Sequence, residues 1–131
     1  MTKIINRFCG VYLVGVALVI FAQFLLEFTY ELESVMRVWF ILDWFSLAGF
    51  GMCVLANGCY MRAHLDETSV TWKKLSSTVL FYISAGTTIA FLHNFAADLF
   101  GNNDDLLFWK FINVVQIPLF AVTGCRLFRV S

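Results

Sequence analysis

The chain has 131 residues, of which 60% are hydrophobic, 18% aromatic and 14% charged, and its nine basic and nine acidic residues give a formal net charge of zero. In soluble domains about 25% of residues are charged, so this composition excludes an ordinary soluble protein, and no nucleic-acid partner is expected. It predicts an all-α integral membrane protein in which a single membrane domain, residues 1–131, accounts for the whole sequence.

The first apolar run predicts a helix over residues 8–26, close to the ~20 residues that a ~30 Å hydrocarbon layer requires. Gly10 and Ala17 are seven residues apart, as are Gly15 and Ala22. Small residues at this spacing form narrow strips where a second helix can approach closely. We therefore expect both strips to face protein.

The second run predicts a helix over residues 38–61, preceded by a short acidic connection that can itself be partly helical. Asp43 interrupts the run near its start. Asp43, Ser46, Cys53 and Asn57 recur at spacings that place them on one face of a helix. This small and polar face is expected to contact other helices.

The third run predicts a helix over residues 72–98, with Asp66 or Thr68 in the preceding loop as its cap. It contains His93, the only histidine within an apolar run. One helical stripe contains Tyr82, Gly86, Ala90, His93 and Ala97. We expect this stripe to face the bundle and not lipid.

The fourth run predicts a helix over residues 106–127. Gly101 precedes it as the terminator of the third helix, and Asn103 or Asp104 is placed to cap the fourth. Pro118 lies near the middle, where a missing backbone donor predicts a kink.

Charge is distributed unequally between the two ends of this four-helix, up-down bundle. One end carries Lys3, Arg7, Arg62, Lys73, Lys74, Arg126 and Arg129 against Asp66 and Glu67. The other end carries Glu27, Glu31, Glu33, Asp43, Asp98, Asp104 and Asp105 against Arg37 and Lys110. The positive-inside rule therefore predicts cytoplasmic N- and C-termini in a plasma or inner membrane.

Polar residues from all four helices converge on one depth. Because neighbouring helices run in opposite directions, Asp43 and His93 both lie about 8 Å below the outer surface. The expected outer-leaflet polar cluster contains Glu27, Asp43, His93, Asn94, Asp98, Lys110 and Asn113. Ionisable residues inside a membrane are functional candidates. Two interpretations stay open: Asp43 pairs with His93 or Lys110 and holds the bundle together, or it relays protons or binds an ion or ligand.

Metal and haem chemistry has weak support. His93, Asp43 and Asp98 form a sparse ligand set without HxxxH or ExxH spacing, so no metal is expected. His64 and His93 lie at opposite ends of the third helix, about 40 Å apart, which excludes bis-histidine haem ligation within one chain. The four cysteines, all predicted near the cytoplasmic side, lack CxxC spacing and are expected to be reduced. Lipid, quinone or haem are allowed as cofactors, but none is required.

No catalytic motif is present, so no catalytic activity of the chain on its own is expected. The leading hypothesis is an accessory or structural subunit of a larger membrane complex, such as an energy-converting or oxidoreductase assembly, packed against partner helices and lipid. One alternative is a small transporter or proton-coupled permease, working as a homo-oligomer and using Asp43 and His93. Another is a membrane anchor that contacts quinone or haem.

Overall fold

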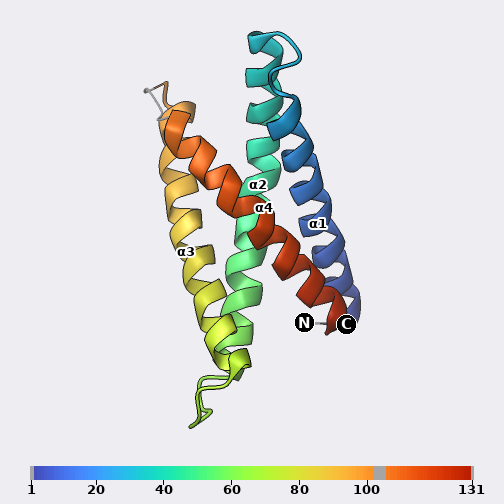
Figure 1. Cartoon of the computed structure of the whole chain (residues 1–131), viewed down its shortest axis with the longest axis vertical. Coiled ribbons are helices and arrows are strands. Elements are labelled where there is room, and N and C mark those ends of the chain that lie inside the picture. Colours follow the sequence, from blue (N-terminus) through green and yellow to red (C-terminus); the bar gives the residue numbers. More distant parts are fainter. Residues whose placement is uncertain (1, 102–105, 131) are drawn as a thin grey trace.

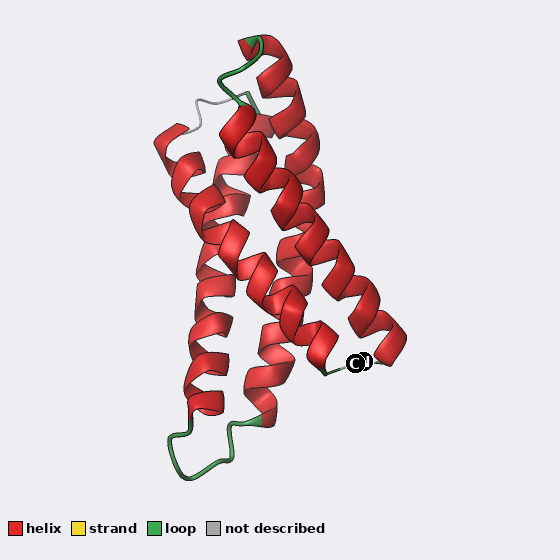
Figure 2. Cartoon of the chain, turned by 45° about the vertical axis from the view of Figure 1, so that its right-hand side comes forward, coloured by secondary structure: helices red, strands yellow, loops and turns green. Residues whose placement is uncertain are grey.

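The computed structural model describes residues 2–101 and 106–130, and these residues form four helices and no strand (Figures 1 and 2). The helices are α1, Lys3–Leu26; α2, Leu32–Ala63; α3, Trp72–Leu99; and α4, Leu106–Arg129. All four are long and apolar enough to cross a bilayer. The predicted all-α architecture with four candidate membrane spans is confirmed for this part of the chain.

Two helices begin earlier than predicted. The Thr2 side chain accepts a hydrogen bond from the Ile5 amide at 3.4 Å, so α1 starts at Lys3 and not at residue 8. The acidic connection continues as helix, so α2 starts at Leu32 and not at residue 38. Nothing in this connection breaks a helix, so α2 extends beyond the apolar run that the sequence marks.

The ends of α3 are set by two local features. Thr71 caps the helix by accepting from the Lys74 amide at 3.2 Å, so the expected caps Asp66 and Thr68 are wrong. Both of those residues lie too early, because the loop continues to residue 71. Gly101 follows α3 with φ of 73°, a backbone conformation that suits glycine, as predicted for a helix terminator. The expected caps of α4, Asn103 and Asp104, lie outside the described residues.

The helices run alternately up and down, and they pack as two close pairs. α1 makes its largest contact with α4, and α2 makes its largest contact with α3. In Figure 1, α4 runs diagonally from the upper end of α3 to the lower end of α1. Both chain ends and the α2–α3 loop lie toward the lower end of the bundle. Because α4 runs diagonally, α3 and α4 diverge toward that end.

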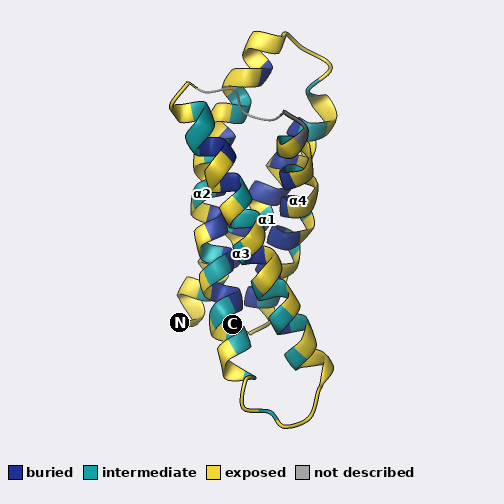
Figure 3. Cartoon of the chain, turned by 90° about the vertical axis from the view of Figure 1, so that its left-hand side faces the viewer, coloured by how far each residue is buried: buried dark blue, intermediate teal, exposed yellow. Residues whose placement is uncertain are grey.

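Buried residues line the centre of the bundle, and exposed residues cover its outside (Figure 3). Phe50, Phe91 and Phe120 come from three different helices and are almost fully buried. Their ring centroids lie 4.9 Å apart for Phe50 and Phe91, and 5.0 Å apart for Phe50 and Phe120. Gly49 makes room for the Phe120 ring, which occupies the space that a Cβ would take.

A glycine pair determines how closely α1 and α4 approach. A Cβ added to Gly10 would lie 2.9 Å from the Gly124 carbonyl oxygen, and one added to Gly124 would lie 2.9 Å from the Gly10 carbonyl oxygen. The Gly10 and Ala17 strip is buried, as predicted. The strip of Gly15 and Ala22 is exposed, contrary to the prediction. At 100° per residue, Gly15 lies about 140° around the helix from Gly10, so only one strip can face α4.

The glycine contact gives a test with a matched control. We expect Gly10→Ala to lower the free energy of unfolding by about 1–3 kcal/mol, because the carbonyl oxygen of α4 cannot move away without separating the helices. Gly15→Ala meets nothing within 4 Å. It should leave stability unchanged or raise it by up to about 1 kcal/mol through helix propensity. Unfolding in mixed detergent micelles, followed by circular dichroism, measures both; equal effects of the two substitutions would contradict the packing described.

Candidate functional site

A cavity of about 310 Å³ lies at the end of the bundle opposite the chain termini, where all four helices contribute residues. Five of the seven residues expected in the polar cluster line it: Glu27, Asp43, Asp98, Lys110 and Asn113. The other lining residues are Phe24, Phe28, Leu32, Val35, Met36, Trp39, Phe40 and Trp109. We call this space the acidic cavity.

The wall of the acidic cavity is braced between α1 and α2. The indole Nε1 of Trp39 donates a hydrogen bond to Oε2 of Glu27 at 3.0 Å. Trp109 stands against Phe91 with ring centroids 5.6 Å apart. These contacts tie two rings of the wall to neighbouring side chains, so part of the lining is held in place by the fold.

Three carboxylates and one ammonium group face this space, together with five aromatic rings. Carboxylates attract cations, and aromatic faces attract cations within about 6 Å of the ring. The volume is at the lower end of the range for small-molecule sites. The arrangement is therefore suited to an organic cation with an apolar body.

His93 does not line the acidic cavity. It is exposed on the outward face of α3, as are Tyr82 and Gly86, so the expected bundle-facing stripe is wrong. The inward face of α3 instead carries Ser77, Ser84, Phe91, Asn94 and Phe95. His93 follows Ser84 by nine residues, about 180° around the helix, so the two side chains point in opposite directions. Asn94 is buried in the bundle.

The weak metal set is divided by this geometry. Asp43 and Asp98 line the acidic cavity, whereas His93 lies outside it. In the described part of the chain no group of three or more His, Cys, Asp or Glu side chains is placed to hold a metal ion. Cys9, Cys53, Cys59 and Cys125 are not joined by disulfides.

A second polar cluster, which was not predicted from the sequence, joins α2, α3 and α4. Phe50, Phe91 and Phe120 separate it from the acidic cavity along the three helices. Nδ2 of Asn57 donates to Oγ of Ser84 at 2.7 Å and to Oγ1 of Thr123 at 3.1 Å. Oδ1 of Asn57 accepts from Arg126, whose guanidinium carbon lies 4.0 Å from the centroid of the Tyr60 ring. Asn57, Ser84 and Thr123 are fully buried. We call these five residues the Asn57 cluster.

The signal for this cluster is present in the sequence. Counted along alternating helices, Asn57, Ser84 and Thr123 fall at one depth, and each lies on a stripe of small or polar residues. Arg126 was counted only as a charge at the cytoplasmic end, and its spacing of three residues from Thr123 places both on one helix face.

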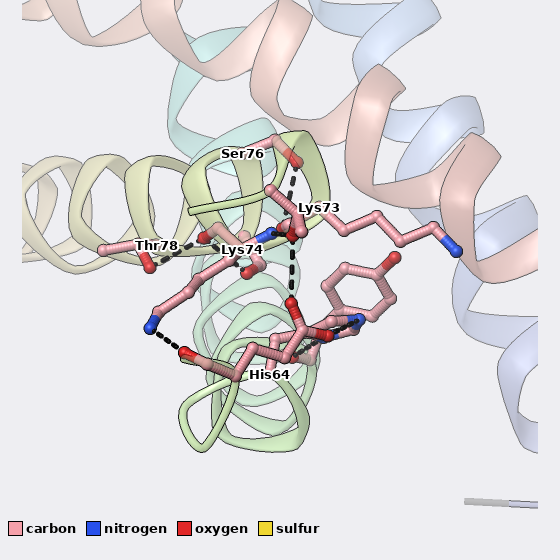
Figure 4. A network of polar contacts seen from close by, with 9 residues as sticks. His64, Lys73, Lys74, Ser76 and Thr78 are labelled. Carbon is pink, nitrogen blue, oxygen red and sulfur yellow. Dashed lines mark hydrogen bonds and ion pairs between the residues drawn. The ribbon is translucent and has the colours of Figure 1, made fainter. Parts of the chain in front are cut away.

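The α2–α3 loop has a polar network of its own (Figure 4). Its centre is Glu67, whose side chain accepts from Thr71 at 2.9 Å and whose backbone carbonyl accepts from Nζ of Lys74 at 2.6 Å. His64 lies against the Tyr60 ring, with centroids 4.7 Å apart, and its Nε2 is 3.9 Å from Glu67. The His64 ring is therefore partly covered. The network orders the loop and offers no open site.

The chain matches no protein-family model, no curated protein and no solved structure.

The Asn57 cluster makes a prediction about stability. Asn57→Ala removes the partner of Ser84, Thr123 and Arg126 together, so we expect the free energy of unfolding to fall by about 1–2 kcal/mol. Thr88→Ala is the control, because the Thr88 hydroxyl donates within its own helix, to the Ser84 carbonyl at 2.6 Å. It should change stability by less than about 0.5 kcal/mol. Detergent unfolding curves compare the two, and a loss no larger for Asn57→Ala than for Thr88→Ala would argue against the cluster.

Proposed function

We propose that this chain is an accessory subunit of a larger membrane assembly, and that it meets its partner through the outward face of α3. The observation that carries the proposal is the exposure of His93, Gly86 and Tyr82 on that face. An imidazole is poorly solvated by hydrocarbon, and a glycine leaves a gap in the helix surface into which a neighbouring helix can pack. Lipid satisfies neither feature, whereas a protein helix satisfies both.

Burial within the chain supports the same face. The most apolar window of α3 is only 17% buried in the described structure, against 39% for the window of α4. Among the corresponding windows of the four candidate spans, that of α3 thus has the smallest buried share. A partner helix on this side would make α3 an internal element of the assembly.

The proposed orientation has both termini in the cytoplasm and the acidic cavity on the opposite side of a plasma or inner membrane. Support comes from the seven basic residues near the termini and the α2–α3 loop, against two at the other end. Short loops rich in Lys and Arg stay on the cytoplasmic side of a membrane, so this difference supports the proposed orientation.

Fusions test the orientation directly. Green fluorescent protein fused after Ser131 should fluoresce, and alkaline phosphatase fused there should be inactive. The opposite result is expected when either reporter is inserted after Gly101. Alkaline phosphatase and green fluorescent protein form a suitable pair, because each is active on one side of a bacterial inner membrane. An active phosphatase after Ser131 would reverse the proposed orientation.

The partner can be tested with glycines that differ only in position. Gly86 on α3 and Gly15 on α1 are both exposed, and a Cβ on either meets nothing within 4 Å. Tagged wild-type protein purified from native membranes in mild detergent should carry a partner in fixed ratio. We expect Gly86→Leu to reduce the recovered partner roughly fivefold or more, the effect of about 1 kcal/mol.

Gly15→Leu should leave recovery unchanged. A monodisperse monomer that carries no other protein, or equal loss with both variants, would contradict the accessory role. His93→Leu provides a second variant on the same face, because it removes the imidazole without adding bulk at the glycine gap.

A second candidate function is favoured by the acidic cavity: binding or transport of an organic cation by a homodimer. The carboxylates and aromatic rings of its wall are suited to such a ligand, as described above. Asp43 is in this wall but His93 is not, so a relay that uses both within one chain is not supported. In the same purification this candidate predicts a dimer of the chain alone, which distinguishes it from the accessory subunit.

A further inference from the structure

Another cavity lies between α3 and α4, in the half of the molecule that carries the chain termini. Its volume is about 460 Å³. Its lining residues are Trp72, Ser76 and Leu80 from α3 and Ala121, Val122, Cys125, Arg126 and Arg129 from α4. These residues belong to the parts of α3 and α4 nearest the chain termini and the α2–α3 loop, where the two ribbons diverge in Figure 1. We call this space the basic cavity.

Arg126 is held in this cavity from the side of α2. One nitrogen of its guanidinium donates to Asn57, and the central carbon of the group lies over the Tyr60 ring. A guanidinium carries five N–H donors, so these two contacts leave further donors available to the cavity. The fold therefore positions the cation and presents it to the space between α3 and α4.

The positive charge of Arg126 has no acidic partner among the described residues. In this part of the chain the contacts of its guanidinium are with the Asn57 amide and the Tyr60 ring, both of which are uncharged. Arg126 is only partly exposed. A partly buried cation in the last turn of a membrane span is stabilised by an anion, and Arg126 and Arg129 both line this cavity.

We propose that the basic cavity binds an anionic phospholipid, with its phosphate at Arg126 and Arg129 and one acyl chain along Leu80, Ala121 and Val122. Arg129 ends α4 and follows Arg126 by three residues, about 4.5 Å along the helix, so both cations lie at the headgroup level.

The apolar lining selects a lipid over a free phosphate. Leu80 lies eight residues into α3 from Trp72, about 12 Å along the axis. The cavity is thus cationic near the end of the helices and apolar toward the middle of the bundle, which matches the polarity of a phospholipid. Trp72 is 79% exposed and begins α3, a position where indole rings prefer the interface. Basic sites between helices on the cytoplasmic side are suited to anionic headgroups.

Native mass spectrometry of the full chain tests the proposal. The protein is released from nanodiscs of equal parts palmitoyl-oleoyl phosphatidylglycerol and phosphatidylcholine, and the retained lipids are counted. We expect retention of phosphatidylglycerol in preference to phosphatidylcholine, by roughly thirtyfold for two cationic contacts of about 1 kcal/mol each. Arg129→Gln should reduce retention roughly fivefold. Equal retention of both lipids would overturn the proposal.

Two further variants separate this site from general attraction. Arg62 is exposed on the last turn of α2 and does not line the cavity, so Arg62→Gln should leave retention unchanged. If Arg62→Gln and Arg129→Gln weaken retention equally, the proposed site is wrong. Val122→Trp fills the apolar part without altering charge and should also reduce retention; unchanged retention would exclude an acyl chain there.

A competition experiment distinguishes the two sources of phosphate. Inorganic phosphate at millimolar concentration should not displace phosphatidylglycerol, because it cannot use the apolar wall. Displacement would show that the cavity takes a free anion and would overturn the assignment to lipid. Arg126→Lys keeps the charge, so it should retain phosphatidylglycerol better than Arg126→Gln, and equal retention by these two variants would remove Arg126 from the site.

Discussion

The hydrogen bonds of the Asn57 side-chain amide determine how α3 and α4 are rotated about their axes. A fully buried amide must be paired, and this one reaches Ser84 on α3 together with Thr123 and Arg126 on α4. Once Ser84 points at α2, the helical period directs His93 to the opposite face of α3. The same constraint that closes the bundle therefore also determines which polar residue remains outside it.

Composition and run length were sufficient to predict four candidate spans, because each apolar run is as long as a bilayer is thick. They could not predict which face of α3 turns inward. The stripe with His93 and the stripe with Ser84 both repeat at helical spacing, and period alone does not distinguish them. The decision depends on Asn57, a residue distant in sequence. Likewise, the exposed strip of Gly15 resembles that of Gly10 in sequence, and only the position of Gly124 separates them.

Most of the predicted polar cluster, by contrast, was accessible from depth alone. Glu27, Asp43, Asp98, Lys110 and Asn113 sit at helix ends that alternate in direction, so residues of equal depth meet wherever the ends converge. Depth gives no information about how each helix is rotated about its own axis, which is why His93 was placed in the predicted polar cluster. Arg126 was overlooked for the opposite reason: its distance from the end of α4 indicated a surface charge, whereas its contacts with Asn57 and Tyr60 hold it against α2.

The three roles assigned to α3 are geometrically compatible. At 100° per residue, Ser84 lies about 80° to one side of Ser76, and His93 lies about 100° to the other side. The bundle side, the basic cavity and the proposed partner face thus occupy different sectors of one helix. A partner on the His93 face would leave the basic cavity accessible, so a lipid can lie beside α3 while a protein covers its outward face. The bound lipid would then border the subunit contact and fill the space left where α3 and α4 diverge.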